Sequence, residues 1–263
     1  MGHRDAHPPP LPPDPNSDWR VTEVEDVGST NDAVADWPAW TALRAGRQTG
    51  GRGRHRRVWV SDPGGLWLSA VVPIGPPDQG WSALPLAAGL AVCETLSACG
   101  VPSLHLRWPN DVLAGPRKLA GLLVDCFRPG LAVVGIGLNV HNRPDRIDPT
   151  LAESVVRLAD LVDDPPALSD LTLRLLAALR EVIGAMEREG FARLATRLDR
   201  WWKTGLEVEI EIDSARWNGF FEGVDAEGRI RVRTAGGSTR VFGAHQVTRL
   251  RESQGFHTHD QGT

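Results

Sequence analysis

The stretch Gln48–Trp59 reads QTGGRGRHRRVW, and it runs directly into a β-rich segment, SDPGGLWLSAVV. Its glycines allow backbone N–H groups to approach a ligand closely, and its arginines offer planar charged groups that suit phosphate and carboxylate oxygens. The stretch is too polar and too rich in glycine for a helix or a buried strand. It therefore predicts a mobile cationic loop hinged on a sheet. Taken alone, the loop fits three interpretations: a solvated basic loop, a nucleic-acid-binding patch, or a loop over an anionic ligand.

The composition is that of an ordinary soluble domain. The chain has 263 residues, of which 41% are hydrophobic and 24% charged, with a formal net charge of −4. A basic function must therefore be local. The three cysteines form no CxxC pair, which indicates thiols in a reducing compartment. We expect no apolar run to reach the length of a membrane span and find no signal-peptide core, so we predict a cytoplasmic protein with no membrane partner.

Lysine is rare in this chain. Of its 29 basic residues, only Lys118 and Lys203 are lysine. A lysine that remains in an arginine-biased sequence can mark a site that needs a compact ammonium. Lys118 lies in a motif-rich neighbourhood, so we take it as a candidate functional residue.

The order of the predicted elements indicates an α+β fold with a mixed sheet and flanking helices, followed by a small β domain. We expect a helix to begin near Asn31, capped by Ser29 or Thr30, and a buried helix to run from Trp81 to Cys99 with Gly100 after it. Another helix is expected over Asp160–Gly190, capped by Ser169, and the next over 191–202. The predicted regions are 1–18 (disordered and Pro-rich), 19–204 (catalytic), 205–251 (a small barrel) and 252–263 (a disordered tail).

A predicted hairpin brings two charged residues together. Leu104–Trp108 is expected to be a strand, and a second strand is expected from Lys118 to Phe127 after a Gly115-Pro116 turn. This places Asp111 and Lys118 near one end of the sheet. They form either a surface salt bridge or a metal-binding carboxylate beside a phosphate-binding ammonium. The apolar run Leu131–Val140 ends in two glycines and an asparagine, which indicates a central strand that lets a ligand lie against its backbone.

Four stretches now stand in order: GSTN, QTGGRGRHRRVW, RWPNDVLAGPRKLAG and VVGIGLNV. Together they resemble the biotin protein ligase family, over about Val21 to Val140. The resemblance implies a class II synthetase-like catalytic domain and a small C-terminal SH3-like barrel. It is closest to the ligase type without an N-terminal DNA-binding domain, because residues 1–18 are too short for one. Arg107 stands where the family usually has lysine.

The resemblance also implies a reaction and a site. Biotin and ATP, with Mg²⁺, form biotinyl-5′-AMP, and the biotin then passes to a lysine of a carrier domain. The implied catalytic residues are Lys118, Arg54 and Arg52. The implied biotin-binding residues are Ser29, Thr30, Asn31, Gln48, Arg52, Gly53, Arg54, Lys118, Gly121 and Gly135. The implied nucleotide-binding residues are Arg54, Arg57, Trp59, Asn110, Lys118 and Asn139. Asp111 is the candidate Mg²⁺ ligand, though a structural role at the hairpin is almost as well supported.

The expected partner is the biotin carboxyl carrier domain of acyl-CoA or pyruvate carboxylases. We expect no DNA partner and a monomer or weak homodimer. Three alternatives remain: a lipoate or octanoyl transferase of the same fold, an RNA-binding module, and a biotin sensor without ligase activity. The negative net charge and the position of Trp59 in a β-rich run argue against RNA binding.

Overall fold

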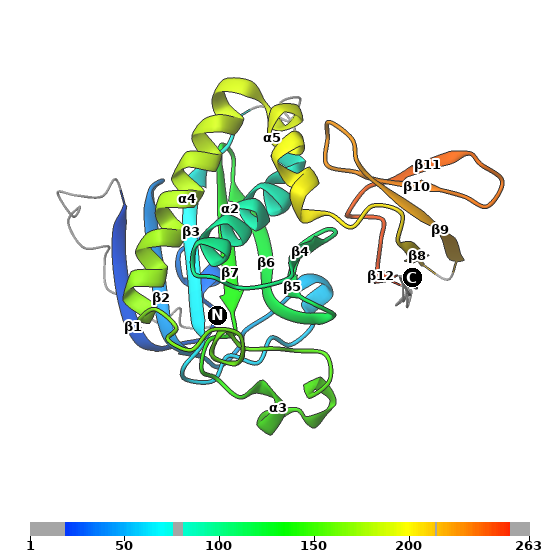
Figure 1. Cartoon of the computed structure of the whole chain (residues 1–263). Helices are drawn as coiled ribbons and strands as arrows, with labels where there is room; N and C mark the ends of the chain where they lie inside the picture. Colours follow the sequence, from blue (N-terminus) through cyan, green and yellow to red (C-terminus); the bar gives the residue numbers. More distant parts are fainter. Residues whose placement is uncertain (1–18, 76–80, 214, 253–263) are drawn as a thin grey trace.

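Seven strands form the main sheet, in the order β1-β2-β3-β7-β6-β5-β4 (Figure 1). The computed structural model describes residues 19–75, 81–213 and 215–252. Strands β1 and β2 pair in parallel, and every other pair is antiparallel, so the predicted mixed sheet is confirmed. The strands are β1 Arg20–Val27, β2 Thr41–Gln48, β3 Leu66–Pro73, β4 Leu104–Arg107, β5 Asp111–Ala114, β6 Arg117–Arg128 and β7 Leu131–Leu138.

The predicted hairpin contains one strand more than expected. Asp111–Ala114 forms β5, which pairs with β4 on one side and with β6 on the other. We expected only a connection here, because the WPND sequence carries a proline and two polar residues. The chain reverses over residues 108–110, so that Asp111 pairs with Arg107 and Ala114 with Leu104.

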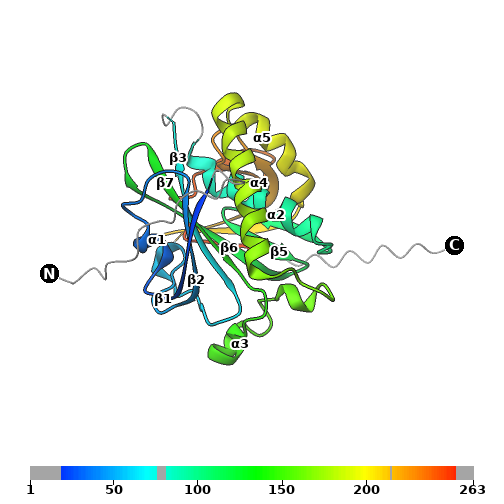
Figure 2. The ribbon, with the colours of Figure 1, turned by 90° about the vertical axis from the view of Figure 1, so that its left-hand side faces the viewer.

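Two long helices cover one face of the sheet, and α1 lies on the other (Figures 1 and 2). The helices are α1 Thr30–Ala33, α2 Leu84–Ala98, α3 Pro144–Ile147, α4 Leu168–Glu189 and α5 Phe191–Leu198. Ser29 caps α1 by accepting from the N–H of Asp32, and Gly100 follows α2 with φ +82°, both as predicted.

The prediction for α4 was wrong at its start. The helix begins at Leu168 without a side-chain cap, so Ser169 is inside it, and Leu158–Asp160 forms only a separate 3-10 turn. Pro165 and Pro166 explain the difference, since each lacks an N–H and the residue before a proline avoids the helical region. The helix predicted over 191–202 ends earlier, at Leu198, and continues as a 3-10 turn over Asp199–Trp201.

The core lies between α2 and the sheet. Nearly all of α2 is buried, because α4 covers its outer side and β4, β5 and β6 lie beneath it. We expected no apolar run to reach the length of a membrane span, and this expectation was wrong. The segment Trp81–Ala98 is long enough and apolar enough to cross a membrane. However, 72% of that segment is buried inside the molecule, as suits the core helix of a folded domain.

A second, antiparallel sheet follows the helices, in the order β11-β10-β9-β8-β12. Its strands are β8 Glu207–Ile212, β9 Ala215–Val224, β10 Ile230–Arg233, β11 Thr239–Phe242 and β12 Arg249–Glu252. This sheet is consistent with the predicted SH3-like domain, and Glu252, which we assigned to the tail, still pairs with Val208. The segments 1–18 and 253–263, predicted to be disordered, lie outside the described residues.

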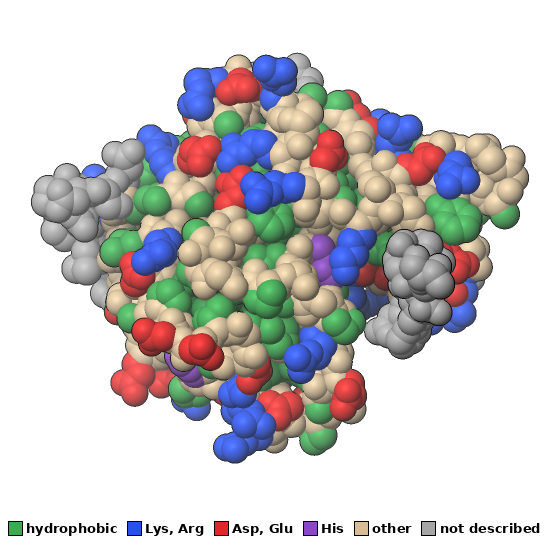
Figure 3. All heavy atoms as spheres, viewed as in Figure 1, with side chains coloured by type: hydrophobic (Ala, Val, Ile, Leu, Met, Phe, Trp, Pro, Cys, Tyr) green, Lys and Arg blue, Asp and Glu red, His purple; other side chains and the backbone are tan. Residues whose placement is uncertain are grey.

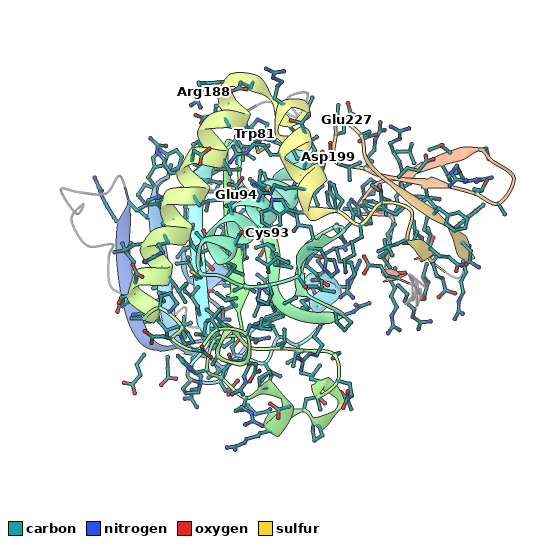
Figure 4. The ribbon with its side chains drawn as sticks, viewed as in Figure 1. Trp81, Cys93, Glu94, Arg188, Asp199 and Glu227 are labelled. Carbon is teal, nitrogen blue, oxygen red and sulfur yellow. The ribbon has the colours of Figure 1, made fainter. Side chains whose placement is uncertain are left out.

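The turn between β9 and β10 anchors the small sheet on the domain that contains the main sheet. Trp108 Nε1 donates to the carbonyl of Gly228 at 2.9 Å, and Ser82 Oγ donates to that of Glu227 at 2.9 Å. Figure 4 labels Glu227 at the end of the small sheet that is nearest the helices. This contact holds the two sheets together close to the hairpin that carries Asp111.

Candidate active site

Three glycines hollow the face of the main sheet that points away from α2. Alternate residues of β6 and β7, such as Leu122, Ile136 and Leu138, belong to the core under the helices. The residues between them face the other way, and three of these are Gly121, Gly135 and Gly137. A Cβ on Gly137 would lie 2.6 Å from Trp59 Nε1, and one on Gly121 would lie 3.1 Å from Lys118 Nζ. The glycines therefore leave the space in which functional side chains lie.

Uncharged polar groups form the floor at one end of this hollow. Gln48 Oε1 accepts from the backbone N–H of Thr30 at 2.8 Å and lies 3.0 Å from its hydroxyl. Ser69 Oγ lies 2.7 Å from Thr30 Oγ1 and 2.6 Å from Asn31 Oδ1, and it is fully buried. Such a set of hydroxyls and amides suits a neutral ligand with several hydrogen-bonding groups.

The cationic loop is held closed by its arginines. Arg52 pairs with Asp32 and with Asp125, at 3.2 Å from the latter. Arg54 donates to the carbonyls of Ala244 and Val247, at 2.5 and 3.0 Å, in the small domain. Arg57 donates to the carbonyl of Thr248 at 3.1 Å. The loop thus bridges both domains over the hollow, and burial lowers the pKa of Arg54.

Lys118 lies at the other end, in a cluster of alternating charges. Its Nζ is 2.5 Å from Asp111 Oδ1, and Arg107 is 2.8 Å from Asp111 Oδ2. Burial alone would raise the pKa of Asp111, but the charges of Lys118 and Arg107 outweigh it and hold that pKa below its ordinary value. Lys118 Nζ also lies 4.8 Å from the centre of the Trp59 ring. This end of the hollow carries the positive charge that an anionic group requires.

The structure brings all of the sequence-predicted site residues together. They line one cavity of about 650 Å³ on this face of the sheet. The lining residues that the sequence predicted are Ser29, Thr30, Asn31, Gln48, Arg52, Gly53, Arg54, Arg57, Trp59, Asn110, Asp111, Lys118, Gly121, Gly135 and Asn139. Their individual roles toward a ligand stay predictions.

Comparison with known proteins identifies the family. The model of the biotin/lipoate A/B protein ligase family matches residues 21–140. A biotin–[acetyl-CoA-carboxylase] ligase of Mycobacterium tuberculosis is 35% identical over 89% of this chain and 91% of its own length. The chain belongs to the biotin protein ligase family. The Escherichia coli bifunctional ligase/repressor BirA is 30% identical over 80% of this chain and 68% of its own.

Solved structures agree with this assignment. The biotin protein ligase from Aquifex aeolicus in complex with biotin and ATP superposes with a TM-score of 0.78. It is 27% identical, and the match covers 89% of this chain and 99% of that one. The fold match thus extends beyond the residues of the family model and into the small C-terminal sheet.

The described residues of the ligase include no preformed set of metal-binding side chains. Among residues 19–75, 81–213 and 215–252, no group of three His, Cys, Asp or Glu side chains is placed to hold one. Both oxygens of Asp111 are already engaged by Lys118 and Arg107. As arranged here, Asp111 acts as an internal counter-ion, so we derive no step through a metal. Its assignment as the Mg²⁺ ligand stays a prediction.

Several cavity residues of the ligase were not predicted from the sequence. Thr248–Glu252 of the small domain line the same cavity, although they are far from the motifs in sequence. Ser69 and Asp125 support the floor and the loop. Both are polar residues within apolar strands, LWLSAVV and LLVDCF, and that interruption was the available signal.

His105 is expected to make the stability of the ligase depend on pH. Burial and then the charge of Lys203 lower its pKa to about 4, and its Nε2 lies 4.0 Å from Glu252 of β12. Histidine in an unfolded chain has a pKa of about 6.5. Below that pH, His105 binds a proton in the unfolded chain but not in the folded protein. Stability should therefore fall between pH 6.5 and 4, by about 2 kcal/mol after discounting for solvent screening.

Urea unfolding at a series of pH values tests this expectation. His105→Gln, which cannot be protonated in this range, should remove that part of the pH dependence. Equal pH dependence in the wild type and the variant would contradict it. Glu252 works in the opposite sense, since burial raises its pKa, so the difference between the two proteins is the quantity to compare.

Proposed function

We propose that this biotin protein ligase uses ATP to activate biotin as biotinyl-5′-AMP and then transfers the biotinyl group to a lysine of a carrier domain. One observation carries the proposal. A single cavity joins a floor of neutral polar groups to an end that carries Lys118 and several arginines. The first suits the ureido ring of biotin, and the second suits a carboxylate and a phosphate that must be brought together.

The positions of the cavity residues support separate roles in binding biotin, the phosphate and the adenine. Ser29, Thr30, Asn31 and Gln48 would hold the ring of biotin over Gly135. Lys118 would lie between the biotin carboxylate and the α-phosphate, where its charge offsets their repulsion most strongly in the transition state. Trp59 would lie beside the adenine, with Asn110 and Asn139 close to the nucleotide, and the closed loop would shield the adenylate from water.

The arginines of the loop argue against the RNA-binding alternative. Arg52 is occupied by two carboxylates, while Arg54 and Arg57 are occupied by backbone carbonyls. On the helix-covered side shown in Figure 3, which is opposite the cavity, positive and negative side chains are interspersed. The guanidinium groups of Arg52, Arg54 and Arg57 are thus engaged within the protein.

The partner that we propose is a biotin carboxyl carrier domain. The relatives from Mycobacterium tuberculosis and Paracoccus denitrificans are named biotin–[acetyl-CoA-carboxylase] ligases. By that likeness, the carrier domain of an acyl-CoA carboxylase is the first candidate and that of a pyruvate carboxylase is the second. We further propose Mg²⁺-ATP as the nucleotide, action in the cytoplasm, and a monomer or weak homodimer.

Biotin-dependent exchange of pyrophosphate into ATP tests the first half-reaction. Purified protein should exchange with biotin and not with lipoate or octanoate. Exchange with either of the other acids would keep the fold and overturn the substrate. Absence of exchange with every acid, together with retained biotin binding, would identify a sensor instead. Transfer to an isolated carrier domain then tests the second half-reaction.

Arg54→Gly should turn the ligase into one that leaks its adenylate. The change removes two hydrogen bonds from a charged donor to the small domain, so the loop should open more often. We expect biotin labelling of bystander proteins to rise at least about tenfold, because each hydrogen bond from a charged group contributes about 1.5–3 kcal/mol and about 1.4 kcal/mol is already a factor of ten. The measurement is a blot of biotinylated protein after incubation with excess serum albumin.

The matched control for Arg54→Gly is Arg56→Gly. Arg56 is exposed in the same loop, so its replacement makes the same change of charge and adds the same glycine. Bystander labelling should stay at the wild-type level in this control. If Arg54→Gly labels only the carrier, the shielding role of the loop is wrong.

A further inference from the structure

Asp125 is the point at which the floor of the biotin site meets the cationic loop. Its Oδ2 accepts from Asn31 Nδ2 at 2.8 Å and from Arg52 Nη1 at 3.2 Å. Asn31 belongs to α1 and Arg52 to the loop, so one carboxylate joins three segments of the chain. Its side chain is 24% exposed and that of Arg52 28%, so the pair is partly shielded from solvent. Charged hydrogen bonds are stronger when they are shielded in this way.

Asp125 is the nearer of two acceptors that set which way the Asn31 side chain faces. An asparagine amide has one donor end and one acceptor end. The NH₂ group of Asn31 donates to Asp125 at 2.8 Å and to the carbonyl of Leu123 at 3.4 Å, which leaves Oδ1 directed at Ser69. Asn31 is 4% exposed and lies over Gly135, in the part of the cavity assigned to the biotin ring. Asp125 therefore contributes the shorter of the two hydrogen bonds that orient a biotin-facing group.

Asp32 provides an internal comparison. It also pairs with Arg52, but its side chain is 58% exposed and it does not share the Asn31 amide. Two carboxylates thus hold the same arginine, and of these two it is Asp125 that also accepts from the Asn31 side chain. A role as a simple counter-ion would make the two interchangeable, while a coupling role would not.

We infer that Asp125 is a positioning residue that couples recognition of the biotin ring to closure of the Arg52 loop. The inference rests on the proposed function of the same cavity. A ligand that engages Asn31 alters the hydrogen bonding of Asp125, and Asp125 passes the change to Arg52. Loop closure is then favoured by the correct ring and not by the nucleotide alone.

Direct binding of biotin without ATP is the first test, followed by steady-state pyrophosphate exchange. Asp125→Asn keeps the size of the side chain but removes its charge. Its single amide oxygen cannot accept from both Asn31 and Arg52 as strongly as the carboxylate does. We expect the biotin Kd to rise about tenfold, the loss typical of one charged hydrogen bond. The KM for ATP should change by less than about twofold, as a surface change would. Asp125→Glu should recover part of the loss.

The controls are Asp32→Asn, which weakens only the loop contact, and Asp26→Asn, an exposed carboxylate that pairs with Arg47 on β1 and β2. Asp32→Asn should raise the biotin Kd less than Asp125→Asn does, because it loosens the loop without affecting the Asn31 amide, and Asp26→Asn should change it by less than about twofold. A double-mutant cycle should show coupling between Asp125→Asn and Asn31→Ala, and additivity between Asp32→Asn and Asn31→Ala. Thermal unfolding of each variant separates loss of the fold from loss of binding.

The outcomes are distinct. Equal effects of Asp125→Asn and Asp32→Asn, or equal rises in KM for biotin and ATP, would overturn the coupling role. A wild-type protein that binds no biotin would instead overturn the proposed function. If wild-type binding is normal and only Asp125 variants weaken the biotin step, the inference stands.

Discussion

Lys118→Ala is expected to slow biotin-dependent pyrophosphate exchange about 10³-fold, the loss typical of one electrostatic group that acts in a transition state. In the folded protein Lys118 balances the charge of Asp111, at 2.5 Å. In Lys118→Ala, the Asp111 carboxylate stays in the cavity, and Arg107 is the cation of this cluster that remains beside it. Two anionic substrates would then meet a site with one positive charge fewer, at the place where adenylate formation needs a positive charge. The step after adenylate formation should be affected less.

The chain supplies a matched control, because Lys203 is its other lysine. Lys203 does not line the cavity, so Lys203→Ala should retain exchange close to the wild-type rate. Lys118→Arg tests whether a compact ammonium is required, and we expect it to recover only part of the rate. The double variant Lys118→Ala with Asp111→Asn should regain substrate binding but not the rate. Pyrophosphate release that Lys118→Ala leaves unchanged would remove the catalytic role.

The sequence predicted the sheet well where the pattern of apolar residues was long and regular. The segment LWLSAVVP, which forms β3, was identified because it alternates and is rich in β-forming residues. Leu131–Val140, most of which forms β7, was identified because a buried strand reads as a continuous apolar run. The short strand Asp111–Ala114 was missed, since its pairing depends on how the preceding residues turn and not on its own composition. The start of α4 was misplaced for a comparable reason, because Ser169 is a good cap but Pro165 and Pro166 fix the boundary.

The site residues were predicted as a set, but the connections among them were not. Motifs indicated that Arg54 belongs to a loop over a ligand, and nothing local indicated that its guanidinium bonds carbonyls at 244 and 247. Those partners are almost 200 positions away. Asp125 was missed in the same way, because its importance comes from two side chains that only the folded chain brings to it. Long-range contacts of this kind leave little trace in the local pattern.

A single methyl group at Gly135 is expected to weaken biotin binding about 100-fold, the cost typical of a small misplacement of a site group. The Cβ of Gly135→Ala would lie inside contact distance of Asn31 Oδ1. Asn31 cannot move aside cheaply, because it is buried and is held by Ser69, Leu123 and Asp125. The methyl group therefore either displaces the amide or fills the space of the ring. We expect the KM for biotin to rise while the KM for ATP changes by less than about twofold.

Gly137→Ala is the matched partner of Gly135→Ala on the same strand and the same face. Its Cβ would meet the ring of Trp59, at 2.6 Å from Nε1, and not Asn31. Since Trp59 is expected beside the adenine, Gly137→Ala should raise the KM for ATP more than that for biotin. Gly236→Ala, in a turn of the small domain where a Cβ has space, should change neither constant. If Gly135→Ala and Gly137→Ala each changed the KM for biotin and the KM for ATP equally, the assignment of the biotin ring to Asn31 and of the adenine to Trp59 would be wrong.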